Sequence, residues 1–125
     1  MISMEKYYEY RKQLQQLYDN SVNGTAKGMI YNELAELKID YDFIDNTFIN
    51  IEKKTVTFEI ISRENQKYID NILIPRINQT IKDFVIKNAK EANNDELVNF
   101  LDQNDYYFDI YRLYKDDKCI ITVQL

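Results

Sequence analysis

Apolar and polar positions follow two different periods along this chain, and the changes of period separate the expected helices from the expected strands. The longest helical pattern covers residues 62 to 92, where apolar residues recur every three or four positions at Ile69, Ile72, Leu73, Ile77, Ile81, Phe84, Val85 and Ala89. Ser62 is suited to be its N-cap. Pro75 lacks a backbone N–H, so it predicts a kink or break near Ile74, followed by a longer helix over residues 75 to 91.

The same period predicts three further helices. Residues 4 to 19 form the first, and residues 25 to 38 form the second after a turn at residues 20 to 24. Two helices joined by so short a loop indicate an antiparallel αα-hairpin. The third is a short helix over residues 95 to 101, which Asn94 is suited to cap.

A period of two predicts a first β-hairpin, with strands at residues 47 to 52 and 55 to 61 and a two-residue turn at residues 53 and 54. Pairing outward from that turn sets apolar residues opposite one another on one face, as Ile51 with Val56, Ile49 with Phe58 and Thr47 with Ile60. Phe48 falls on the other face. Residues 39 to 44 are compatible with an additional short strand.

A second β-hairpin is predicted at the C-terminal end, with strands at residues 106 to 115 and 118 to 125 and a turn at residues 116 and 117. One face then pairs Tyr114 with Cys119, Arg112 with Ile121, Ile110 with Val123 and Phe108 with Leu125. The opposite face pairs Leu113 with Ile120, Tyr111 with Thr122 and Asp109 with Gln124, with Tyr107 beyond them.

These elements predict a single α+β domain over residues 1 to 125, in the order αα-ββ-α-α-ββ. A four-stranded antiparallel sheet made of the two hairpins carries the central helix on one face. The N-terminal helical hairpin covers about residues 4 to 38, and the sheet and central helix cover about residues 47 to 125. The pattern does not determine the strand order or whether the helical hairpin packs on the sheet.

The charge distribution limits the classes of partner that the chain can bind. The formal net charge is −5, and residues 91 to 111 contain six acidic residues and no basic one. That balance argues against nucleic acid as a partner, because phosphate contacts need a basic surface. No membrane span or secretory signal is recognisable, so we expect a cytoplasmic protein. The abundance of Ile, Asn, Lys and Tyr indicates an AT-rich genome, such as that of a bacterium or phage.

Few residues offer chemistry. The chain has no His, which removes the usual general base and metal ligand, and Cys119 falls on the predicted core face. The glycines at residues 24 and 28 lack the flanking pattern of a phosphate-binding loop. We therefore expect no enzyme activity and no cofactor. One alternative is a small-ligand or divalent-metal module built on carboxylates, from Asp40 and Asp42 or from Asp102, Asp105 and Asp109.

Tyrosine is the unusual component, with 11 residues in the chain. Tyrosine provides a large contact area with a polar tip and is enriched at protein interfaces. The outer face of the second hairpin brings aromatic and aliphatic residues close to acids, which predicts a docking surface comprising Tyr107, Asp109, Tyr111, Leu113, Ile120, Asp102 and Asp105. The competing interpretations are that the helical hairpin covers this face or that the chain forms a homodimer through it.

The function that this surface favours is a small acidic binding protein of the inhibitor, immunity-protein or antagonist type, which occludes a basic surface of a protein partner. The alternatives are a structural or adaptor subunit of a homo-oligomer or larger assembly, and the ligand or metal module described above.

Overall fold

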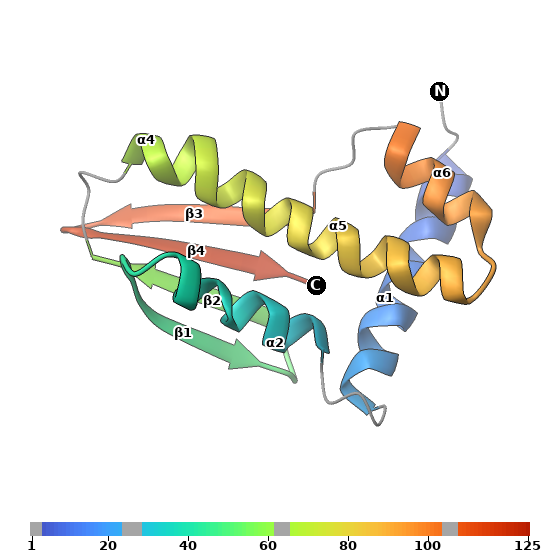
Figure 1. Ribbon diagram of the computed structural model, residues 1–125, viewed down its shortest axis with the longest axis horizontal. Coiled ribbons are helices and arrows are strands. Elements are labelled where there is room, and N and C mark those ends of the chain that lie inside the picture. Colours follow the sequence, from blue (N-terminus) through green and yellow to red (C-terminus); the bar gives the residue numbers. More distant parts are fainter. Residues whose placement is uncertain (1–3, 24–28, 62–65, 104–107) are drawn as a thin grey trace.

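The computed structural model of the protein describes residues 4–23, 29–61, 66–103 and 108–125. Its strands form one antiparallel sheet in the order β1-β2-β4-β3. The strands are β1 (Ile44–Asn50), β2 (Thr55–Ile60), β3 (Asp109–Lys115) and β4 (Lys118–Gln124). The two hairpins therefore meet through β2 and β4, while β1 and β3 form the edges (Figure 1).

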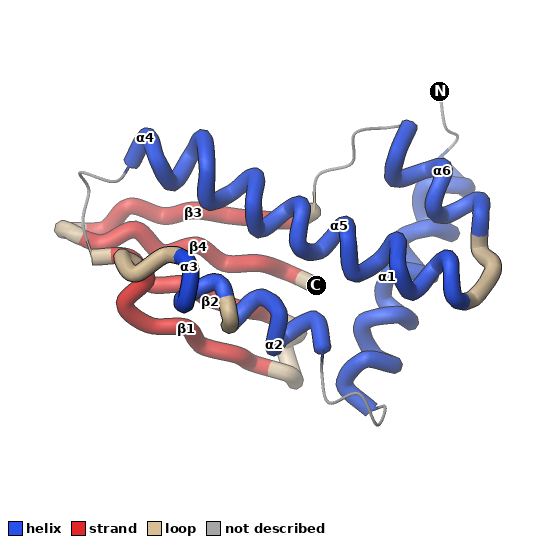
Figure 2. The backbone as a smooth tube through the Cα atoms, in the orientation of Figure 1, coloured by secondary structure: helices blue, strands red, loops and turns tan. Residues whose placement is uncertain are grey.

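Helices precede the first hairpin and connect it to the second hairpin, as the sequence pattern predicts. They are α1 (Met4–Asn23), α2 (Met29–Ala35), α3 (Leu37–Asp40), α4 (Gln66–Tyr68), the π-helical segment η2 (Ile69–Leu73), α5 (Ile74–Glu91) and α6 (Asp95–Gln103). The predicted α+β fold, with a helical N-terminal part and a four-stranded antiparallel sheet, is confirmed. Figure 2 shows α2 in front of the strands and α1 beyond one end of the sheet.

The second hairpin has the predicted register. Tyr114 lies opposite Cys119, and Leu113 lies opposite Ile120. Its turn consists of two residues, and the first of them, Asp116, has a φ of 55°. Aspartate is among the few residue types that tolerate this left-handed conformation, so the turn chemistry and the strand alternation agree.

The first hairpin differs from the prediction, because its register is displaced by two residues. Ile49 lies opposite Val56, and the turn occupies residues 51–54 instead of 53 and 54. The side chain of Asn50 accepts a hydrogen bond from the Lys53 N–H at 3.0 Å, which closes the longer turn. Leu125 adds support from the end of β4, since its N–H donates to the Lys54 carbonyl at 2.8 Å. A displacement of two residues preserves the alternation, so Val56, Phe58 and Ile60 are buried as predicted. The prediction is wrong for Ile49 and Ile51, which are 43% and 55% exposed.

The segment before β1 is also different from the prediction. Residues 37–40 form the short helix α3, so the additional strand at residues 39 to 44 is wrong. The second predicted helix is divided into α2 and α3. The turn predicted at residues 20 to 24 is wrong for residues 20–23, which continue α1 to Asn23, and residues 24–28 lie outside the described part of the chain. Strand β1 instead begins at Ile44, with a bulge between Ile44 and Asn46.

The central helix changes from a π-helical to an α-helical segment at Ile74, and α5 (Ile74–Glu91) matches the predicted longer helix over residues 75 to 91. The five-residue π-helical segment η2 precedes α5, and Pro75 is the second residue of α5. The backbone of Tyr68, Leu73 and Ile74 remains helical across both junctions. The proposed cap Ser62 lies outside the described residues.

A pair of asparagines ends α5 and begins α6. Asn93 has a φ of 56°, and its N–H donates to the Lys90 carbonyl at 3.0 Å. The Asn94 N–H donates to the Ala89 carbonyl at 2.8 Å, which completes a Schellman motif. The Asn94 side chain then accepts from the Leu97 N–H at 3.2 Å, so the predicted cap of this helix is confirmed.

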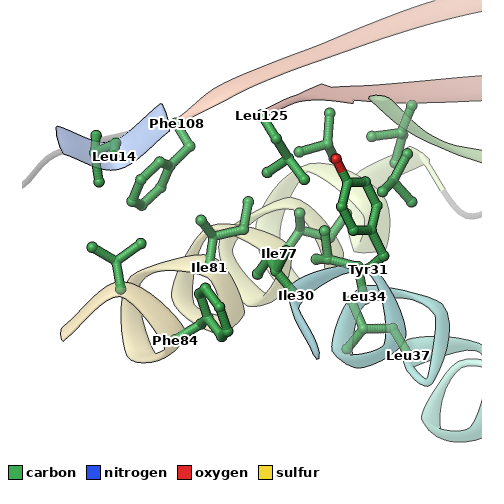
Figure 3. Packing of buried hydrophobic residues seen from close by; sticks show 14 of the residues in the cluster. Leu14, Ile30, Tyr31, Leu34, Leu37, Ile77, Ile81, Phe84, Phe108 and Leu125 are labelled. Carbon is green, nitrogen blue, oxygen red and sulfur yellow. The ribbon is translucent and has the colours of Figure 1, made fainter. Parts of the chain in front are cut away.

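The core lies between the inner face of the sheet and the helices α2 and α5. Buried residues of β2 and β4 pack with one stripe of α5 and with α2, including Val56, Phe58, Ile121, Val123, Ile30, Leu34, Ile77 and Ile81. Helix α1 extends the core past the end of the sheet, where Leu14 points towards Phe108 (Figure 3). The ring of Tyr10 stacks on Phe100 of α6 with the centroids 4.4 Å apart.

One buried polar group fixes the start of β3 against α5. Asn78 is buried, and its Oδ1 accepts a hydrogen bond from the Phe108 N–H at 2.8 Å. Asn78→Ala should therefore lower the free energy of unfolding by about 1–3 kcal/mol, because it leaves the buried N–H without that acceptor. Urea denaturation measures the loss, with the exposed neighbour Gln79→Ala as control. Equal stabilities for the two variants would contradict this role of Asn78.

Candidate protein-binding surface

The side chains that point away from α5 form the outer sheet face, defined here by Phe48, Thr57, Glu59, Asp109, Tyr111, Leu113, Ile120, Thr122 and Gln124. The strand order aligns them in cross-strand rows. One row runs from Phe48 through Thr57 and Thr122 to Tyr111. The neighbouring row places Ile120 between Glu59 and Leu113.

The apolar members of this face are largely uncovered. Tyr111 is 59% exposed, Leu113 is 58% exposed and Phe48 is 55% exposed. On the inner side of the two central strands, Phe58 of β2 and Ile121 and Val123 of β4 are fully buried. The described helices therefore leave the outer sheet face to solvent, and the interpretation that the N-terminal helices cover it does not hold for these residues. Helix α2 lies on the inner side instead, where its Ile30 and Leu34 are fully buried.

The carboxylates of the outer sheet face are paired within the chain. Asp109 Oδ2 accepts from Arg11 Nη2 of α1 at 2.7 Å, and Glu59 Oε1 accepts from Lys118 Nζ at 2.8 Å. The hydrogen bond from Lys118 lowers the pKa of Glu59, and the same contact raises the pKa of Lys118. Exposed ion pairs of this kind contribute little to stability, because water and salt screen them. Their main effect is to offset the negative charge of the face.

The structure brings four of the predicted docking residues together on this face, namely Asp109, Tyr111, Leu113 and Ile120. Asp102 lies on α6 and is exposed, and Tyr107 and Asp105 lie outside the described residues. The alternation of the first hairpin predicts Phe48 on the outer face. Its place in one cross-strand row with Tyr111 depends on the strand order, in which β1 and β3 are opposite edges. A hairpin pattern contains no signal for that order.

Arg112, the charged residue on the inner face of β3, forms an ion pair with the π-helical segment. Arg112 Nη1 donates to Asp70 Oδ1 of η2, and the Tyr114 hydroxyl lies 3.4 Å from the same oxygen. Beside them, Cys119 is fully buried, and burial raises the pKa of its thiol. The thiolate that nucleophilic chemistry requires is therefore disfavoured, and Cys119 packs as a small apolar residue.

A second feature is an acidic groove of about 360 Å³ between the α2–α3 segment and α5. It is lined by Glu33, Glu36, Leu37, Asp40, Arg76, Thr80 and Asp83. Partial burial raises the pKa of Glu33, and the neighbouring carboxylates Glu36 and Asp83 act in the same direction, against the opposing charge of Lys87. Within the described part of the chain, no three acidic or sulfur-bearing side chains are arranged to hold a metal ion.

Comparisons of the chain with protein-family models, with curated proteins and with solved structures returned no match. The described helices include none that is long and apolar enough to cross a membrane.

The acidic groove generates a prediction about pH. Because the pKa of Glu33 is raised in the folded state, folding favours its protonated form, and this contribution is lost as the pH rises through the folded pKa. Glu33→Gln should therefore raise the melting temperature at pH 7 by a small amount. The difference should vanish below about pH 4, where glutamate is protonated in both states. The exposed turn residue Glu52→Gln is the control, and a lower melting temperature for Glu33→Gln at pH 7 would contradict the assignment.

Proposed function

We propose that this protein is a non-catalytic binding protein that docks through its outer sheet face and occludes a basic surface of a protein partner. The observation that carries the proposal is the contrast between the two faces of one sheet. Tyr111, Leu113 and Phe48 are more than half exposed on a face that the described helices leave open, whereas Phe58, Ile121 and Val123 on the inner side of the central strands are fully buried. Several large exposed apolar side chains on one face are typical of interaction sites on small proteins.

The composition of the outer sheet face suits protein recognition. Tyr111 and Phe48 are rigid rings with few rotatable bonds, so holding them at an interface costs little side-chain entropy. Thr57, Thr122 and Gln124 lie beside them and supply hydrogen-bonding groups. The threonines lie between the two rings in the cross-strand row, so the face combines apolar contact area with hydrogen-bonding groups, as protein interfaces commonly do.

The basic character of the partner is supported by the charge of the whole chain, which is −5. Asp109 and Glu59 each form an ion pair within the chain. The negative charge that attracts a partner over distance therefore lies outside the exposed apolar residues of the outer sheet face, which we call the apolar strip (Phe48, Tyr111 and Leu113). It comes from carboxylates away from that face, namely those of the acidic groove on the helical side of the sheet and the exposed Asp102 of α6, and it acts on the approach of a basic partner to the whole molecule. Long-range charge then accelerates encounter with a basic surface, and the apolar residues determine how long the complex lasts.

This proposal places the protein with inhibitors, immunity proteins and antagonists that act by blocking a partner. The absence of His in the chain and the buried Cys119 support a non-catalytic role. We infer a cytoplasmic location as part of the same proposal.

The combined substitutions Tyr111→Ser and Leu113→Ser test the docking role. A tagged protein would be used to capture partners from a lysate of the native host, with mass spectrometry identifying the bound proteins. We expect one stoichiometric partner whose affinity falls at least about tenfold in the variant, since central aromatic and aliphatic contacts carry most of the energy of an interface.

The matched control removes two exposed apolar residues from other surfaces, Ile39→Ser in α3 and Ile72→Ser in η2. Circular dichroism would establish that both variants are folded. Equal loss of the partner in both variants, or unchanged capture by the Tyr111 and Leu113 variant, would refute the docking role of the outer sheet face. Weaker association at high salt is expected for the wild type and tests the electrostatic part separately.

A further inference from the structure

The two edges of the sheet are not equivalent. Unpaired N–H and C=O groups along an edge strand can pair with another strand, and proteins usually obstruct such edges. Strand β1 is obstructed, because it contains a bulge between Ile44 and Asn46 and because Lys38 Nζ donates to the Asp45 carbonyl at 3.0 Å. Strand β3 is seven residues long and pairs with β4 without a register shift. It contains no proline, and no described strand pairs with its outer edge.

The sequence of β3 is complementary to itself when read in the opposite direction. An antiparallel copy centred on Arg112 places Asp109 opposite Lys115 of the second copy, so that opposite charges meet at both ends. On the outer side, Tyr111 lies opposite Leu113 of the second copy. On the inner side, the partly buried residues Ile110 and Tyr114 lie opposite each other. Such cross-strand apolar and opposite-charge pairs stabilise antiparallel sheets.

Other registers lose this match. A shift of one residue would set an outward-facing side chain against an inward-facing one, which the pleat does not allow in a continuous sheet. Centring the pairing on Tyr111 sets Asp109 opposite Leu113, and centring it on Leu113 sets Asp109 opposite Asp117. Only the register centred on Arg112 uses the whole strand with favourable ends.

In this register Arg112 lies on the two-fold axis, and its positive charge is partly neutralised within each chain. The two Arg112 side chains would face each other across the symmetry axis, which is unfavourable for isolated cations. Each guanidinium is bound by Asp70 of η2 in its own chain, which offsets its charge. The salt bridge thus fixes the central helix to β3 and makes the symmetrical arrangement tolerable.

We propose that β3 pairs antiparallel with β3 of a second copy of this chain, in the register centred on Arg112, and joins two four-stranded sheets into one. The contact is isologous, as expected for a two-fold homodimer. It does not rest on the proposed function, since edge pairing leaves the outer sheet faces of both copies open. It sets Tyr111 of one copy beside Leu113 of the other and makes the exposed apolar strip continuous across the dimer.

Sedimentation velocity over a range of concentrations tests the association, with Lys115→Glu as the variant. The substitution sets a glutamate opposite Asp109 of the second copy at both ends of the contact, so we expect the dimer dissociation constant to rise about tenfold or more. Lys90→Glu in α5 changes the net charge equally at an exposed site away from β3 and is the control. A wild-type protein that stays monomeric at about 100 µM, which is ample for a stable dimer, or equal weakening by both variants, would overturn the proposal.

Disulfide trapping tests the register. Tyr111→Cys and Leu113→Cys proteins should form a cross-linked heterodimer when mixed under mild oxidation, because opposite residues bring their Cβ atoms to about 4.5–5.5 Å, close to disulfide reach. Neither variant alone should cross-link efficiently, and wild type controls for the buried Cys119. Cross-linked homodimers of the single variants with no heterodimer in the mixture, or no cross-link in any sample, would refute pairing in this register. A Lys115→Glu monomer that still captured the partner would separate this contact from the docking function.

Discussion

Burial of a single face of the sheet is the constraint from which most of this structure follows. Successive side chains of a strand point to opposite faces, so a layer of helices on one side buries every second residue and leaves the others exposed. Val56, Phe58 and Ile121 reach the core, whereas Thr57 and Tyr111 face the other way. Helix α5 is the main element of that layer, and η2, at its N-terminal end, contacts β3 through Asp70 and Arg112.

The N-terminal helix contributes to this arrangement from the end of the sheet. Helix α1 is joined to α6 by the stacking of Tyr10 on Phe100 and by a hydrogen bond from Asn94 Nδ2 to the Gln13 side chain at 2.7 Å. Its Arg11 binds Asp109 at the beginning of β3. These contacts fix α1 beside the ends of the strands, which explains why a helix of this length does not cover Tyr111 and Leu113.

The register of the second hairpin was predictable from its turn residues and its alternation, whereas that of the first hairpin was not. Asp116 and Asp117 form the two-residue turn that the alternation implies, and the register follows. In the first hairpin, Asn50 closes a longer turn, and the end of β4 supports it through Leu125. That support comes from residues about 70 positions away, so no pattern within the hairpin could indicate it.

The same distinction applies to the candidate surface. Alternation alone placed Tyr111, Leu113 and Ile120 on one face. It could not place Phe48 in their row, because the pairing of β2 with β4 joins segments that are distant in sequence. Nor could it show that Asp109 is bound by Arg11, a residue 98 positions away. The predicted acidic rim therefore becomes, at this position, an ion pair that holds α1 in place.

The separation of charge from apolar surface gives the molecule its binding character. On the outer sheet face, each carboxylate of Glu59 and Asp109 has a cation within 3 Å, so the apolar strip is close to neutral although the chain carries −5. On the other side, Glu33 and its neighbours lie together in the groove, where partial burial and, to a smaller extent, the charges of Glu36 and Asp83 raise the pKa of Glu33. Long-range electrostatic attraction and short-range apolar contact with a partner thus arise from different residues. A neutral strip can meet a second copy without repulsion at the contact, while the acidic side still attracts a basic partner.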